Sequence, residues 1–153
     1  MIDGLPVLFL DANIFFAAVA SKKGGSFFII ELAKSERIIP ATSAYALIEA
    51  EKNIKLKLGE RALMLHRKNI LEISPYIPRI NTTESKMEEI VSNYVSEKDI
   101  PIVLGAMESN ADFLVTLDRK HLLDNEDLKD MGFGFYLVTP GDFLQKYFGK
   151  KLQ

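Results

Sequence analysis

The stretch Val7-Leu8-Phe9-Leu10-Asp11-Ala12-Asn13 decides the fold of this 153-residue chain. Its four apolar residues form a short continuous run between Pro6 and Asp11, which is typical of a central strand buried on both faces. In an open parallel α/β sheet the functional crevice lies beyond the carboxyl ends of the strands. The stretch therefore predicts a central strand and also a carboxylate, Asp11, at the functional edge of the sheet.

The rest of the chain alternates strand patterns with helix patterns. Further strands are expected at Ile38-Ile39 (ended by Pro40), 70–73, Phe113–Val115 and 135–138. Helices are expected at 14–20, from Ser26 to about Arg37, at Ala44–Leu58 after a cap by Thr42 or Ser43, and at 60–68, 84–95, 101–109 and from Thr139 onward. This alternation predicts an α/β sandwich with a mostly parallel sheet. No linker or repeat interrupts it, so residues 1–153 are expected to form a single domain.

Composition excludes several classes of function. The chain has no cysteine, which rules out disulfides, thiolate metal sites and cysteine nucleophiles. The net charge of −2 means that local basic patches, and not global attraction, would have to hold a polyanion. The apolar runs are far too short to span a membrane, and Met1-Ile2-Asp3-Gly4-Leu5-Pro6 carries no basic region of a secretory signal. We therefore expect a cytoplasmic protein without a membrane partner.

Four acidic residues can reach one crevice. Asp11 directly follows the first strand and Asp118 lies three residues after Val115, so the two carboxylates converge if those strands are neighbours. Glu49 lies off the apolar stripe of its helix and shares a face with Asn53. Asp99 precedes Pro101 at the opening of a helix, where backbone N–H groups support a carboxylate.

Clustered carboxylates repel one another and require a counter-charge to stay ionised. Hard oxygen ligands favour Mg²⁺ or Mn²⁺, the usual partners of phosphate substrates, and such an ion can generate hydroxide for in-line phosphoryl transfer. The sequence contains no Walker loop, Ser–His–Asp set or histidine cluster that would compete with this interpretation. The residues thus indicate a metal-dependent nuclease.

Four segments, in order along almost the whole chain, resemble the PIN-domain family: Val7-Leu8-Phe9-Leu10-Asp11-Ala12-Asn13, 43–49, Asp99-Ile100-Pro101-Ile102-Val103 and Leu114-Val115-Thr116-Leu117-Asp118. The resemblance implies a three-layer α/β/α fold and an endoribonuclease acting on single-stranded or structured RNA. It implies a role as the toxin of a toxin–antitoxin pair, with an antitoxin protein as partner, or in RNA processing, and it suggests a homodimer. It assigns catalysis and metal binding to Asp11, Glu49, Asp99 and Asp118, with Asn13 and Thr116 in supporting polar positions.

The chain departs from the family's pattern near its last acid. Leu117 stands where many relatives have a small residue, and Arg119 and Lys120 stand where a further acid often follows. This argues against a complete second metal site. The same two cations, with Lys52 and Lys55 on the helix after Glu49, are instead candidates for binding the phosphate backbone of a nucleic acid; the alternative is an ordinary solvated surface.

Three further alternatives stay open at this point. His66 is expected on a helix surface and His121 as a packing residue, which argues against cleavage by a histidine pair. A non-catalytic binding module could keep the fold without a productive metal. A haloacid-dehalogenase-like phosphatase would want a second Asp two residues after Asp11, where Asn13 stands, and we rank it lowest.

Overall fold

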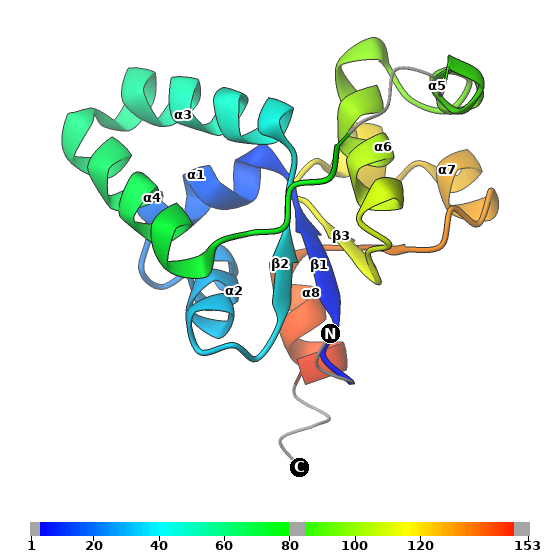
Figure 1. Ribbon diagram of the computed structural model, residues 1–153. Coiled ribbons are helices and arrows are strands. Elements are labelled where there is room, and N and C mark those ends of the chain that lie inside the picture. The colour runs from blue at the N-terminus through cyan, green and yellow to red at the C-terminus, as the bar shows by residue number, and fades with distance from the viewer. Residues whose placement is uncertain (1–3, 80–84, 149–153) are drawn as a thin grey trace.

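A computed structural model describes residues 4–79 and 85–148, with helices gathered on both sides of a small sheet (Figure 1). The helices and strands in chain order are β1 (Val7–Leu10), α1 (Ala12–Ala20), α2 (Gly25–Lys34), β2 (Ile39–Ala41), α3 (Ala44–Leu58), α4 (Glu60–Ile73), α5 (Ser85–Ser92), α6 (Ile100–Glu108), β3 (Phe113–Val115), α7 (Glu126–Asp130), β4 (Tyr136–Val138) and α8 (Pro140–Asp142). Shorter helical segments lie at Glu97–Asp99, Arg119–Leu123 and Phe143–Phe148.

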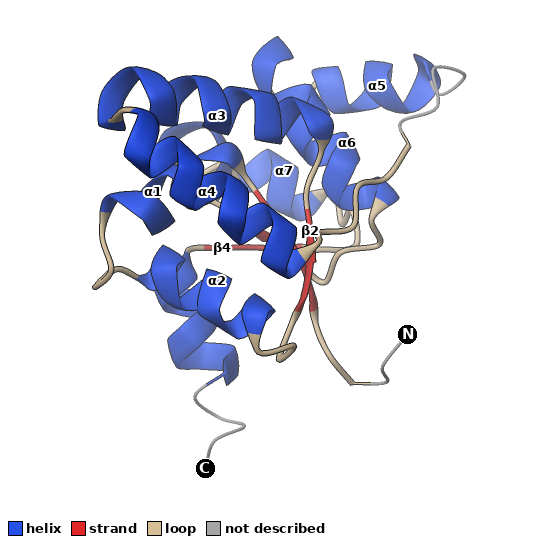
Figure 2. Ribbon diagram, turned by 60° about the vertical axis from the view of Figure 1, so that its left-hand side comes forward, coloured by secondary structure: helices blue, strands red, loops and turns tan. Residues whose placement is uncertain are grey.

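The sheet has the order β2-β1-β3-β4, and every neighbouring pair is parallel. The predicted adjacency of β1 and β3 is confirmed, with Leu10 opposite Val115. Helices α1 to α4 lie on one side of the strands and α5 to α7 on the other, and Figure 2 shows the strands enclosed between them. This is the expected three-layer α/β/α architecture. It explains why Leu8, Phe9 and Leu10 are all fully buried.

The strand order creates a switch point between β1 and β3. The chain leaves β1 toward β2 on one side, whereas it leaves β3 toward β4 on the other. Ligand crevices of open α/β sheets lie at such points, beyond the carboxyl ends of the strands. The backbone N–H of Asp11 donates to the carbonyl of Val115 at 3.1 Å, so the residues that follow the two strands begin side by side.

Three predicted helix ends are confirmed by their hydrogen bonds. Ser43, one of the two candidates, caps α3 by accepting the N–H of Ala46 at 3.1 Å. Gly59 ends α3 with a φ of +93°, a conformation that favours glycine, and α4 begins directly after it. Thr139 caps α8 by accepting the N–H of Asp142 at 3.0 Å.

The strand predicted at 70–73 is wrong, because these residues complete α4. Leu63, His66, Asn69 and Ile73 are buried at helical spacing, whereas Leu71 is 80 % exposed. The spacing continues the helical face instead of alternating, and Ser74 ends the helix in the left-handed region with a φ of +41°. A short apolar run alone does not separate these two structures.

Two smaller expectations also differ from the structure. Pro40 lies inside β2 and does not end it. Because β2 is an edge strand of the four-stranded sheet, a residue without a backbone N–H is tolerated there. Ser26 lies buried within α2, which begins at Gly25 with Gly24 as its cap. The start expected for a helix at Glu84 lies outside the described residues, and α5 is described from Ser85.

Candidate active site

A crevice of about 420 Å³ lies at the carboxyl ends of β1 and β3. All four acids singled out from the sequence line it, although they come from four different elements. Its further polar members are Asn13, Asn53, Lys57 and Lys98, and its apolar members are Ala12, Phe16, Ile102 and Leu117. The fold therefore brings together carboxylates that are far apart in the sequence.

Asp11 is buried, with 7 % of its surface exposed. Its Oδ1 accepts the N–H of Ala12 at 2.7 Å and so caps α1, while its Oδ2 accepts the hydroxyl of Thr116 at 2.8 Å. Burial raises the pKa of Asp11 to about 6; Glu49 and Asp99 raise it further, and the bonds from Thr116 and Ala12 oppose them. Capping of α1 therefore uses one of the two carboxylate oxygens of Asp11.

The two supporting polar residues tie the strand ends together. Thr116 is fully buried, and its Oγ1 also accepts the N–H of Asp118 at 3.0 Å. The Oδ1 of Asn13 accepts the N–H of Leu117 at 3.1 Å, and its Nδ2 donates weakly to Asp11 and Thr116, at 3.4 Å each. These bonds hold the loop after β3 against the start of α1.

Asp99 and Glu49 approach the crevice from the two helical layers. Asp99 is buried in the turn before α6, and its Oδ2 accepts the hydroxyl of Ser96 at 2.9 Å. Glu49 is exposed on α3, with Asn53 and Lys57 following at helical spacing along the crevice. Burial raises the pKa of Tyr45 on the same helix, and the charges of Glu49, Asp99 and Asp11 raise it further.

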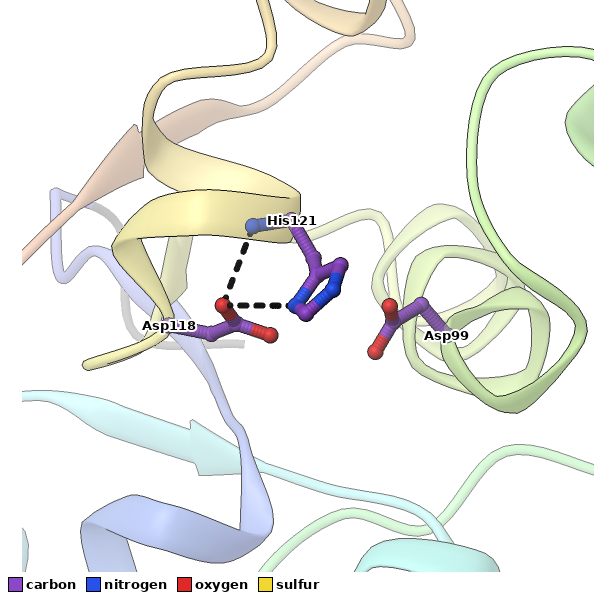
Figure 3. A group of neighbouring side chains, drawn as sticks. All are labelled: Asp99, Asp118 and His121. Carbon is purple, nitrogen blue, oxygen red and sulfur yellow. Dashed lines mark hydrogen bonds and ion pairs between the residues drawn. The ribbon is translucent and has the colours of Figure 1, made fainter.

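Asp118 has a histidine beside it that the sequence interpretation placed wrongly. Asp118 caps the segment Arg119–Leu123, and its Oδ1 accepts the backbone N–H of His121 at 3.1 Å and lies 3.2 Å from its Nδ1 (Figure 3). Asp99, Asp118 and His121 each offer a ligand atom, and these atoms lie within 4.8 Å of one another. The side chain of His121 is 41 % exposed, so it is not the expected packing residue.

His66 was also misplaced, in the opposite sense. It was expected on a helix surface but is only 2 % exposed, with its ring against the edge of Phe15. Burial lowers the pKa of His66, with a smaller opposing effect of Glu51. The position of His121 beside Asp118 has one signal in the sequence, its spacing three residues after an acid that caps a helical turn.

The predicted cationic residues lie outside the lining of the crevice. Lys55 pairs with Glu60 and Arg119 with Asp124, each at 3.7 Å, while Lys52 and Lys120 are exposed. Lys57 and Lys98 line the crevice instead, with the Nζ of Lys57 lying 5.8 Å from the centre of the Phe16 ring. Lys57 could have been found from its spacing to Glu49 and Asn53, whereas Lys98 has no signal beyond its neighbour Asp99.

The donor set fits a hard divalent cation such as Mg²⁺ or Mn²⁺. Four carboxylic acids from different elements line one small space, and among the described residues its cationic lining is limited to Lys57 and Lys98. Asp11 and Asp99 are buried and accept hydroxyl hydrogen bonds from Thr116 and Ser96, so their orientation does not depend on the ion. Asp118 donates its own backbone N–H to Thr116 and accepts the backbone N–H of His121 at Oδ1, so neither bond uses its Oδ2.

Comparisons with known proteins identify the family and support the fold. A family model described as PIN domain matches residues 7–120. The solved structure of VapBC2 from Rickettsia felis, bound to a DNA fragment from its promoter, is similar in fold, with a TM-score of 0.64 and 17 % sequence identity. The match covers 87 % of this chain and 98 % of the other. No curated protein sequence matches.

Proposed function

Because the chain belongs to the PIN-domain family, we propose that it is a metal-dependent endoribonuclease that hydrolyses RNA phosphodiester bonds. The observation that carries the proposal is the convergence of Asp11, Glu49, Asp99 and Asp118 on one crevice at the switch point of the sheet. Asp11 and Asp118 also cap helical segments, but the mutual repulsion of four acids in one crevice costs stability unless a cation is bound. RNA as the substrate rests on the family resemblance.

The residues of the crevice would have different roles in the reaction. The four acids would hold Mg²⁺ or Mn²⁺, which supplies a nucleophilic hydroxide at neutral pH and neutralises charge on the phosphate. Thr116 and Asn13 orient the acids that follow the two central strands. Lys57 and Lys98 line the crevice and are candidates for binding phosphate oxygens, beside the apolar side chains of Phe16 and Ile102.

The biological role we propose is that of a toxin in a toxin–antitoxin pair, acting in the cytoplasm; RNA processing is the other role that suits the same site. The fold likeness to VapBC2, which was solved on DNA from its promoter, supports the first of these. In the described residues no helix is both long and apolar enough to span a bilayer. An adjoining reading frame for a small antitoxin-like protein would favour the toxin role, and its absence would favour processing.

A cleavage assay tests the enzymatic proposal. Purified protein is incubated with labelled single- and double-stranded RNA and DNA, with Mn²⁺, with Mg²⁺ and with a chelator. We expect internal cleavage of RNA only with a divalent ion, and its loss in Asp118→Asn and Glu49→Gln. Glu51→Gln, on the same helix but outside the crevice, is the matched control and should cleave normally. Cleavage that persists in chelator or in both crevice variants would contradict the proposal.

A non-catalytic binding module is the alternative function. It keeps the fold and binds nucleic acid or protein, so it predicts binding of RNA without cleavage at any metal concentration. A metal titration followed by the same cleavage assay separates the two. The four acids that line one crevice favour the enzyme, because such a set of oxygen donors is typical of a site built for a divalent cation.

We propose that an antitoxin protein covers the outer surface of α3 and α4. Ile48 and Leu56 on α3 are 70 % and 76 % exposed, and Met64 and Leu71 on α4 are 68 % and 80 % exposed. The two helices pack against each other, and large exposed apolar side chains on neighbouring helices are typical of protein interfaces. Co-expression with the adjoining reading frame should give a complex that Ile48→Lys and Leu71→Lys weaken. A homodimer is the other possible occupant, and light scattering that finds only monomer at high concentration would exclude it.

A further inference from the structure

We propose that His121 is a nitrogen ligand of the divalent cation and that it makes this site bind Mn²⁺ in preference to Mg²⁺. The inference rests on the metal site of the proposed function and adds a ligand of a different chemical class to its carboxylates. Figure 3 shows the imidazole between the carboxylates of Asp118 and Asp99, which come from different elements. The three ligand atoms lie within 4.8 Å of one another, a span that one bound ion can bridge.

Nδ1 of His121 is the ring nitrogen placed for this task, because it lies 3.2 Å from Oδ1 of Asp118. Two neighbouring ligand atoms of one octahedral ion, each about 2.1 Å from it, lie about 3 Å apart, so this nitrogen and the carboxylate of Asp118 can share one ion. Without the ion, a protonated Nδ1 can donate to Asp118, and this bond keeps the ring beside the carboxylate.

The surrounding structure holds His121 in place but leaves its ring accessible. Its backbone N–H bonds to the capping carboxylate of Asp118, and the next two residues, Leu122 and Leu123, are buried. The imidazole itself is 41 % exposed and makes no aromatic contact among the described residues. A packing role therefore does not explain its position, and the remaining alternative is that it only orients Asp118.

The chemistry of the two ions gives the preference its direction. Mg²⁺ takes oxygen ligands in a strict octahedron and retains several waters, whereas imidazole suits later first-row ions. Mn²⁺ also binds carboxylates, but it is the first member of the first-row series of divalent transition metals, whose later members bind imidazole well. A nitrogen donor should therefore raise the affinity for Mn²⁺ more than the affinity for Mg²⁺. Removal of His121 should consequently weaken Mn²⁺ binding more than Mg²⁺ binding.

Pulsed electron paramagnetic resonance of the Mn²⁺-loaded protein tests the ligand directly. We expect a nitrogen coupling that changes when histidine is labelled with ¹⁵N and disappears in His121→Asn. The chain has only two histidines, and His66 is buried against Phe15, so the label reports on His121. His121→Asn can still donate to Asp118, which separates loss of the ligand from loss of that bond.

Calorimetric titration measures the selectivity in the same proteins. The affinity of His121→Asn for Mn²⁺ should fall on the order of tenfold or more, and its affinity for Mg²⁺ should fall clearly less. Lys120→Ala, a neighbour outside the three-residue metal group, is the control and should retain the parent's ratio of the two affinities. Mn²⁺ binding without a nitrogen coupling, or equal losses for both ions, would overturn the inference.

The outcomes distinguish this inference from the proposed function. Metal-dependent cleavage without nitrogen coupling removes the role of His121 and leaves the nuclease standing. Nitrogen coupling without cleavage of any nucleic acid supports His121 as a ligand and contradicts the nuclease. Absence of Mn²⁺ binding to the folded protein contradicts both.

Discussion

The hydroxyl of Thr116 donates a 2.8 Å hydrogen bond to Oδ2 of Asp11, across 105 positions of the chain. Both residues directly follow central strands, β3 and β1, and the same hydroxyl oxygen accepts the N–H of Asp118. One fully buried side chain thereby connects two of the four acids. The geometry of the crevice is set by the pairing of β1 and β3 and then fixed by this residue.

Thr116→Val should weaken metal binding and RNA cleavage, although valine has nearly the same shape as threonine. The variant loses the bond that lowers the pKa of Asp11 and leaves the N–H of Asp118 without that acceptor. Loss of such an orienting group typically costs roughly 10- to 100-fold in metal affinity or activity. Calorimetric Mn²⁺ titration and the RNA cleavage assay measure both, and Thr116→Ser, which keeps the hydroxyl, should remain close to the parent. Equal Mn²⁺ affinity in the valine variant would contradict the role.

The fold and the acidic cluster could be predicted because they depend on local signals that the topology then combines. A buried strand ending in Asp11 and another ending shortly before Asp118 were each visible as short apolar runs. Parallel pairing of those strands was enough to predict that the acids meet. Their catalytic and metal-binding roles stay predictions.

Other features could not be predicted because burial depends on tertiary contacts. Residues 70–73 were ambiguous between strand and helix, and only packing of α4 against α1 and α3 decided for the helix. His66 and His121 exchanged their expected surroundings, since neither the buried face of α4 nor the turn after Asp118 was fixed by sequence pattern. Lys98 reaches the crevice from a short helical turn whose direction no periodicity reveals.

Asp11→Asn should make the stability of the folded protein less dependent on bound metal. It keeps the shape of the side chain but removes one charge and one anionic ligand, so the metal-free variant should be at least as stable as the parent. A divalent ion at a hundredfold excess over its dissociation constant stabilises a folded protein by roughly 2.7 kcal/mol, and this gain should shrink in the variant. Thermal melts with and without Mn²⁺ measure it, and cleavage should fall by orders of magnitude. A destabilised variant with the parent's full response to Mn²⁺ would mean that Asp11 is only structural.

The raised pKa of Asp11 predicts a pH dependence for the metal-free protein. Between its ordinary value of 3.8 and the folded value of about 6, the unfolded chain releases a proton that the folded protein retains. The contribution of Asp11 is therefore fully present below pH 4 and is lost as pH rises through 6, at a cost of roughly 3 kcal/mol. Urea unfolding in chelator from pH 4 to 7.5 should show Asp11→Asn gaining on the parent across this window. A constant difference between the two proteins would show that burial does not shift Asp11.

Gly105 should tolerate no side chain, because α6 approaches β1 closely there. A Cβ at this position would lie 2.6 and 2.7 Å from the Cζ and Cε2 atoms of Phe9, whose ring is fully buried. Gly105→Ala is expected to lower the free energy of unfolding by about 1–3 kcal/mol through overpacking. Because α6 follows directly after Asp99, Mn²⁺ affinity should fall as well. Phe9→Leu in the same chain makes room, so the double variant should be more stable than the sum of the single effects; simple additivity would refute the contact.

The affinity for RNA should depend on the salt concentration and on which cationic side chains contact phosphate. Lys57 and Lys98 line the crevice, whereas the four residues predicted from the sequence lie outside its lining, two of them in exposed ion pairs. Exposed pairs contribute little stability, so they can exchange their partner for phosphate at low cost.

The crevice lysines and the four outer cations are therefore tested against each other, in an Asp11→Asn background that prevents cleavage. Each lost phosphate contact should lower the slope of log affinity against log salt by roughly 0.7–0.9 and weaken binding across sequences. We expect Lys57→Ala with Lys98→Ala to reduce the slope by nearly two such contacts. The second variant changes the four outer residues to Ala: Lys52, Lys55, Arg119 and Lys120. If it binds RNA like its background at every salt concentration, the path of the RNA stays within the crevice and does not follow the outer surface of α3.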